Sequence, residues 1–326
     1  MTAPLARLRE RSITFANGSI GHNIDIPSAT PVNYFEAISR SAEMARVTID
    51  GKLFLPPGAS DSTPLPLVII VPGSLGVAGS HLAHAQTLTG FGIAAFVLDP
   101  FGARGVASTV ANQTQYSFAA SAYDVLAAWQ VLSAKPQIDA ARIGAQGHSR
   151  GGSAVLAAAC RRFADAAIGP GKGLKAVLAA YPWSGHQFLD PAVGETEIRV
   201  LMGDRDEWCS PMQVQGHVQA IRLTGGKASV RLFGGAAHSF DRGSPLARIE
   251  DAAVSPAALT AYIADDGAFI HPLQSAPDPG LKDRDLMVYG LKSGYGVKGA
   301  TIGTRGEEAS LFRADMIAFW QRTLKA

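Results

Sequence analysis

The sequence is poor in cysteine and has no long apolar run. Its 326 residues include only two cysteines, Cys160 and Cys209, too few for the disulfide framework of a small secreted protein. No stretch approaches the roughly 18 consecutive apolar residues of a membrane-spanning helix. The N-terminal segment carries charge but lacks the apolar core of a secretory signal peptide. We therefore expect a cytoplasmic protein without a membrane partner.

An excess of charge of one sign is also missing. The chain has 29 lysine and arginine residues against 27 aspartate and glutamate residues, so its formal net charge is only +2. This near balance provides no basic surface for nucleic acid, which excludes that class of partner. Hydrophobic residues make up 47% of the chain and charged residues 17%. Such a composition is typical of a compact enzyme with a large core, and not of a disordered chain.

Short apolar runs alternate with helical segments through most of the chain. Buried strands are predicted at 67–71, 93–98, 142–145, 174–180, 198–202 and 228–233, with helices between them that include 118–132 and 211–223. This alternation builds βαβ units, and hence a mostly parallel, doubly wound sheet flanked by helices. The predicted fold class is α/β. In such sheets, ligands bind beyond the carboxyl ends of the strands.

One stretch, RIGAQGHSRGG at 142–152, contains the G-x-S-x-G motif of a nucleophile elbow. A β-prone run precedes it and an alanine-rich helical segment follows, as the motif requires. The sharp turn between them strains the serine backbone, and the small residues Gly147 and Gly151 let strand and helix approach each other. We predict that Ser149 is a catalytic nucleophile.

A serine hydroxyl needs a base beside it, and that base needs an acid to orient it. In α/β hydrolases the chain order is nucleophile, acid, histidine. His238 follows the last predicted strand and is the expected base. Two acids, Asp204 and Asp206, follow the strand before it; we favour Asp206 because it lies further into the loop, and we retain Asp204 as the alternative.

Backbone N–H groups beside the nucleophile are expected to form an oxyanion hole. The N–H of Arg150 is one predicted donor, and the N–H of Ser74, in the loop after the strand at 67–71, is the second. Side chains in the strand-end loops are candidates for a substrate pocket, with ordinary packing as the alternative: Leu75, Trp183, Trp208 and Phe240. His81 and His84 share one side of a predicted helix, but no third ligand has matching spacing, so we expect no metal site.

At this point the chain resembles the dienelactone hydrolase-like family of the α/β-hydrolase superfamily. The resemblance rests on VIIVPGSLG (68–76), FVLDPFGARG (96–105), GAQGHSRGG (144–152), VLMGDRDEWCSP (200–211) and GAAHSF (235–240). It implies an α/β-hydrolase fold and a Ser149–Asp206–His238 triad that acts on a small-molecule ester or lactone without a cofactor.

Two departures from the family pattern bear on the substrate. Dienelactone hydrolases proper carry cysteine at the nucleophile position, where this chain has Ser149. The usual His-Gly before the oxyanion loop is Pro72-Gly73 here. The serine favours a general esterase over a hydrolase of dienelactone itself.

The predicted core, 46–240, begins with a strand or hairpin at 46–55 that has Asp50-Gly51 as its turn. Residues 1–45 show little periodicity and are expected to form an N-terminal arm, and 309–326 should form the last core helix. The insertion between them, 241–308, is unusually long, with a short helix expected from Ser255 and an irregular hairpin within 285–303. Either it is surface decoration or an oligomer contact, or it is a flap over the pocket.

Two other functions fit parts of the sequence. Gly73, Gly76 and Gly79 follow a strand, and Asp99 ends the next strand, as in an NAD(P)-dependent short-chain dehydrogenase. The glycine spacing is wrong for that class, however, and no tyrosine has a lysine four positions later. The third possibility is a non-catalytic small-molecule binder on a hydrolase scaffold, which an intact triad disfavours.

Overall fold

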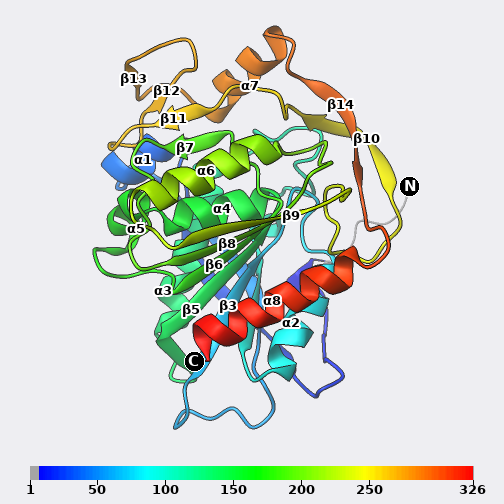
Figure 1. The fold of residues 1–326 in the computed structure, drawn as a ribbon. Helices are drawn as coiled ribbons and strands as arrows, with labels where there is room; N and C mark the ends of the chain where they lie inside the picture. The colour runs from blue at the N-terminus through cyan, green and yellow to red at the C-terminus, as the bar shows by residue number, and fades with distance from the viewer. Residues whose placement is uncertain (1–6, 326) are drawn as a thin grey trace.

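The computed structural model describes residues 7–325 and has one large sheet of eight strands at its centre (Figure 1). The strand order is β1-β2-β4-β3-β5-β6-β8-β9. The first three strands pair antiparallel and all the others parallel. The strands are β1 (Gly21–Thr30), β2 (Ala45–Phe54), β3 (Leu65–Val71), β4 (Ala94–Asp99), β5 (Ile138–His148), β6 (Ala176–Ala180), β8 (Glu197–Gly203) and β9 (Ala228–Phe233). The predicted doubly wound α/β fold is confirmed.

Helices cover both faces of this sheet. In Figure 1, α2 and α8 cross the face toward the viewer, and α3 and α4 pack together behind it. The helices are α1 (Tyr34–Ser39), α2 (Gly79–Gly90), α3 (Phe118–Ser133), α4 (Arg150–Ala159), α5 (Arg161–Ile168), α6 (Pro211–Leu223), α7 (Asp283–Lys292) and α8 (Glu308–Leu324). Because helices cover both faces, β3 and β6 are apolar throughout, and residues 67–71 of β3 are almost completely buried. Among residues 7–325, no helix is both long enough and apolar enough to cross a membrane.

The N-terminal region contains regular structure that its sequence pattern did not predict. β1 pairs along its whole length with β2 and forms the edge of the sheet, and α1 follows it. Residues 1–45 therefore contribute more than an arm, although 1–6 lie outside the described residues. β2 runs unbroken through Asp50 and Gly51, so the expected strand is present and the turn within it is not.

The segment 241–308 forms a cap over the carboxyl ends of the central strands (Figure 1). It contributes β10 (Ala247–Val254) and β14 (Val297–Ile302), which pair with each other. It also contributes α7, and β11 (Ala261–Ile263), β12 (Phe269–Ile270) and β13 (Pro277–Asp278), which extend from β7 (His186–Phe188) in a second small sheet.

Two local predictions for the cap were wrong. After Ser255 the chain makes a single turn, closed by the Ala258 N–H on the Ser255 carbonyl, and then pairs with β7 instead of continuing as a helix. Where a hairpin was expected, the chain contains the helix α7 followed by the strand β14. Asp285 accepts a hydrogen bond from the N–H of Lys282 at the start of α7, and Gly294, with φ of 77°, follows its end.

Candidate active site

Ser149 lies at the turn from β5 into α4, where the carboxyl ends of β3, β5 and β6 meet. Its φ is 55°, a left-handed conformation that is strained for any residue except glycine. Its N–H donates to the carbonyl of Ala180 at 2.9 Å, which ties the turn to β6. A Cβ at Gly147 would overlap the backbone of Gly151, and a Cβ at Gly151 would overlap the end of β3. The tight approach predicted for the elbow therefore requires both glycines.

The side chains of Ser149, His238 and Asp206 form a hydrogen-bonded chain. His238 Nε2 lies 2.9 Å from Ser149 Oγ, and His238 Nδ1 lies 2.7 Å from Asp206 Oδ2. A carboxylate only accepts hydrogen bonds, so Nδ1 carries the proton and Nε2 is free to accept from the serine. Asp206 and His238 are both buried. This is the geometry of a nucleophile, a base and an orienting acid.

The structure distinguishes the two candidate acids by their contacts. The second oxygen of Asp206 accepts from the N–H groups of Trp208 and Cys209, at 2.7 and 2.9 Å, which fixes the carboxylate toward His238. Asp204 instead accepts from the N–H of Gly235 at 2.7 Å and does not reach the histidine. Burial raises the pKa of the Cys209 thiol well above its ordinary value, so this nearby sulfur is a neutral thiol.

Ser74 and Arg150, the predicted oxyanion-hole residues, line the same cleft as Ser149. The side chain of Arg150 has a separate role that its sequence position did not predict. Its guanidinium is buried, donates to the carbonyls of Gln113, Tyr116 and Ser117, and lies 4.1 Å from the centre of the Phe118 ring. It therefore holds the loop before α3 against the elbow.

The cleft beside Ser149 has about 860 Å³ of empty space, part of it open to solvent. The core and the cap both contribute to its walls, and the residues that line it include Trp183, Trp208, Ala253, Leu259, Leu286 and Met287. Leu75 lines a smaller hollow that Ser149 and His238 also border. The structure does not place Phe240 in either, because this side chain is completely buried and packs against Tyr181, Phe233 and Phe312.

The cap also contacts His238 and the residue that stacks on it. The N–H of Gly303, just after β14, donates to the carbonyl of His238 at 2.9 Å. The indole N–H of Trp208 donates to the carbonyl of Thr301 in β14, and the Trp208 ring stacks on the His238 ring at 5.2 Å. The insertion thus contacts the His238 backbone directly and the His238 ring indirectly, through Trp208.

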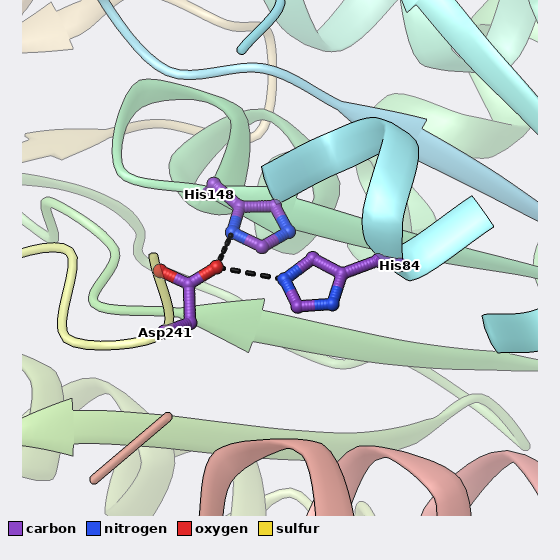
Figure 2. A group of neighbouring side chains, drawn as sticks. All are labelled: His84, His148 and Asp241. Carbon is purple, nitrogen blue, oxygen red and sulfur yellow. Dashed lines mark hydrogen bonds and ion pairs between the residues drawn. The ribbon is translucent and has the colours of Figure 1, made fainter. Parts of the chain in front are cut away.

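A second buried cluster lies behind the elbow, and sequence reasoning did not find it. His84 of α2 and His148 at the end of β5 both point toward one oxygen of Asp241, at 2.7 and 3.4 Å (Figure 2). The other oxygen accepts from the hydroxyl of Tyr181 at 2.6 Å. His81, which the sequence grouped with His84, instead accepts from a backbone N–H within its own helix turn. The cluster includes His148, next to Ser149, and Asp241, three residues after His238, and up to 157 positions separate its members.

The buried histidines make stability depend on pH. Burial lowers the pKa of His81, His148, His186 and His217, to about 3 for His186 and about 4 for His217. Below about pH 6.5 the unfolded chain therefore binds protons that the folded chain does not, and the free energy of unfolding falls as the pH falls. Burial raises the pKa of Asp283 to about 6, which offsets part of this loss because the folded state takes up that proton first.

Between pH 7 and pH 5.5 we expect the free energy of unfolding to fall, with His186 and His217 each contributing about 1 kcal/mol, measured by urea unfolding at both pH values. His217→Gln removes one of the four titrating groups and should reduce this pH dependence by about 1 kcal/mol. Equal free energies at the two pH values would contradict the assignment of these histidines as neutral in the folded state.

The fold and the site together define an α/β hydrolase. Residues 49–262 match the model of the dienelactone hydrolase family, and the chain belongs to that family. This membership supports a hydrolase and favours neither the dehydrogenase nor the non-catalytic binder. None of the curated proteins compared with the chain matches it.

Several solved structures are similar to the chain at low sequence identity. A protein named m3DLH is 18% identical, with a TM-score of 0.52, and the match covers 84% of this chain and 95% of that one. A dienelactone hydrolase-like promiscuous phosphotriesterase from metagenomic libraries is also 18% identical, with coverage of 68% and 84% and a TM-score of 0.49. A putative dienelactone hydrolase from Klebsiella pneumoniae is 18% identical, with coverage of 68% and 89% and a TM-score of 0.49.

Proposed function

We propose that the protein is a serine hydrolase that cleaves carboxylic esters or lactones through an acyl-enzyme on Ser149. The observation that carries this proposal is the position of His238, within hydrogen-bond distance of both Ser149 and Asp206. The strained backbone of Ser149 supports it, because strain of this kind is maintained only where the surrounding structure imposes it.

In the first half of the reaction, His238 Nε2 takes the hydroxyl proton as Ser149 Oγ bonds to the carbonyl carbon of the substrate. The carbonyl oxygen becomes an oxyanion, which the N–H groups of Ser74 and Arg150 stabilise. The tetrahedral intermediate then expels the alcohol oxygen, which receives the proton from His238. Asp206 holds the imidazole in the required tautomer and stabilises its charged form.

In the second half, His238 removes a proton from water, and the resulting hydroxide attacks the acyl carbon. The new tetrahedral intermediate expels Ser149 Oγ, which recovers its proton from His238 as the carboxylic acid leaves. With a lactone, alcohol and acid are parts of one molecule, and the same two steps open the ring.

A fluorophosphonate tests this proposal directly, because it modifies an activated serine. We expect one adduct per chain by intact-protein mass, located on Ser149 by digestion, together with turnover of p-nitrophenyl acetate and butyrate. Prior labelling should abolish that turnover. If the fluorophosphonate forms no adduct and the protein hydrolyses neither ester, the proposal is wrong.

A further inference from the structure

Two buried polar atoms at the cleft have no hydrogen-bond partner within residues 7–325: Asp283 Oδ1, at the start of α7, and His186 Nδ1, in β7. Both residues line the cleft that contains Ser149. Their side chains are only 5% and 7% exposed, and the two atoms lie 3.5 Å apart. An unpaired buried polar atom is costly, so its presence in a ligand cleft points to a ligand that supplies the missing partner.

The surrounding structure holds both side chains in this position. Asp283 Oδ2 accepts from the N–H of Phe118, the first residue of α3, at 2.9 Å, which fixes the carboxylate and leaves Oδ1 free. The imidazole of His186 lies among three aromatic side chains, Trp183, Phe118 and Phe269, with ring centres 4.6 to 5.5 Å away. None of these rings forms a hydrogen bond with Nδ1.

Charge limits the kind of group that fits. Burial lowers the pKa of His186 to about 3, so its imidazole is neutral at pH 7, while Asp283 carries the negative charge. The guanidinium of Arg150 lowers the pKa of both groups, so its positive field extends over the pair. Its own hydrogen bonds go to Ser121 and to backbone carbonyls, and it does not pair with Asp283 Oδ1.

We propose that Asp283 and His186 form a subsite for a neutral hydroxyl group on an otherwise apolar ester substrate. This subsite disfavours esters that also carry a free carboxylate. A hydroxyl donates to the free carboxylate oxygen and completes its hydrogen bonding. A carboxylate would meet the like charge of Asp283 at a desolvated site. The remaining wall, with Leu259, Leu286 and Met287, suits an alkyl chain. This inference rests on the proposed ester hydrolysis and names the substrate class of the same site.

Four p-nitrophenyl esters of one chain length test the wild-type protein: the hexanoate, the 3-hydroxyhexanoate, the 6-hydroxyhexanoate and the mono-adipate. We expect kcat/KM for at least one hydroxy ester to exceed that for the hexanoate by about 10- to 100-fold, because the hydroxyl satisfies a buried charged acceptor. The mono-adipate should be at least about tenfold poorer than the hexanoate. Equal kcat/KM values for all four esters would overturn the proposal without any variant.

Asp283→Asn changes the free acceptor into a donor while its amide oxygen can still accept from Phe118 N–H. We expect this variant to lose most of the hydroxy-ester preference and to raise the mono-adipate to hexanoate ratio by at least about tenfold. Asp285→Asn makes the same change at an exposed position of α7, and should leave both ratios at their wild-type values. Identical changes in both variants would show an effect of net charge alone and would reject the subsite.

Failure of this inference differs from failure of the proposed function. If Ser149 is labelled and the hexanoate is hydrolysed, but Asp283→Asn changes all four esters by the same factor, the hydrolase remains and the subsite is rejected. If Ser149 is not labelled and no ester is hydrolysed, the proposed function itself fails, and the subsite fails with it.

Discussion

Replacement of Ser149 by alanine is expected to lower kcat for p-nitrophenyl butyrate by at least about 10³-fold, and by up to about 10⁶-fold if the triad acts as a unit. The variant has no oxygen to attack the carbonyl carbon, and His238 has no hydroxyl within reach to deprotonate. The cleft and the backbone donors remain in place, so the variant should still bind substrate and retain some activity above the rate in water.

The variant should remain folded, because alanine occupies little less space than serine and only the hydrogen bond to His238 is lost. Thermal unfolding beside the wild type checks this. Ser153→Ala is the matched control, since its hydroxyl lies one turn further along α4 and donates to the carbonyl of Trp183 instead. We expect this control to change kcat by less than about tenfold. Turnover by Ser149→Ala at the rate of Ser153→Ala would exclude Ser149 as the nucleophile.

Asp206→Asn is expected to reduce kcat by about 10⁴-fold, the loss that the equivalent change causes in a serine protease triad. The amide of asparagine can donate to His238 Nδ1, which favours the tautomer with its proton on Nε2. That nitrogen could then no longer accept the proton of Ser149. The N–H groups of Trp208 and Cys209 can still donate to the amide oxygen of the asparagine, so the loop should keep its conformation.

Asp204→Asn provides a matched control from the same loop. Asp204 bonds to the N–H of Gly235, and its asparagine can keep this bond, so we expect kcat to stay within about threefold of the wild type. Measuring kcat of both variants from pH 5 to pH 9 distinguishes a loss of activity at every pH from a displacement of the pH profile. A larger loss in Asp204→Asn than in Asp206→Asn would reverse the assignment of the two acids.

The features that depend on short stretches of chain could be predicted from the sequence. The elbow glycines, the apolar β-branched strands and the last helix each have a local pattern, and α8 spans 308–324 where a helix was predicted within 309–326. Chain order then limited the acid to two residues and the base to one. It favoured Asp206 but kept Asp204 as an alternative, because the outcome depends on which carboxylate the loop turns toward His238.

The edge strand β1 shows why a local pattern can fail. Its sequence, GHNIDIPSAT, has polar residues and a proline where a buried strand would have apolar ones. It forms a strand because every residue pairs with β2, and because Ile26 is buried. The energy that holds it there comes from the partner strand, which a window of ten residues does not contain.

The sequence by itself determined the α/β class and the family resemblance and predicted a nucleophile and its base, because these follow from motifs and from the order of elements along the chain. Only the tertiary structure decided how the cap closes the cleft, that Asp241 joins His84, and that Asp283 meets Phe118 from 165 positions away. Such contacts come from the packing of separate elements against one another. The residue pattern of one element does not indicate which distant backbone group will donate a hydrogen bond to its buried carboxylate.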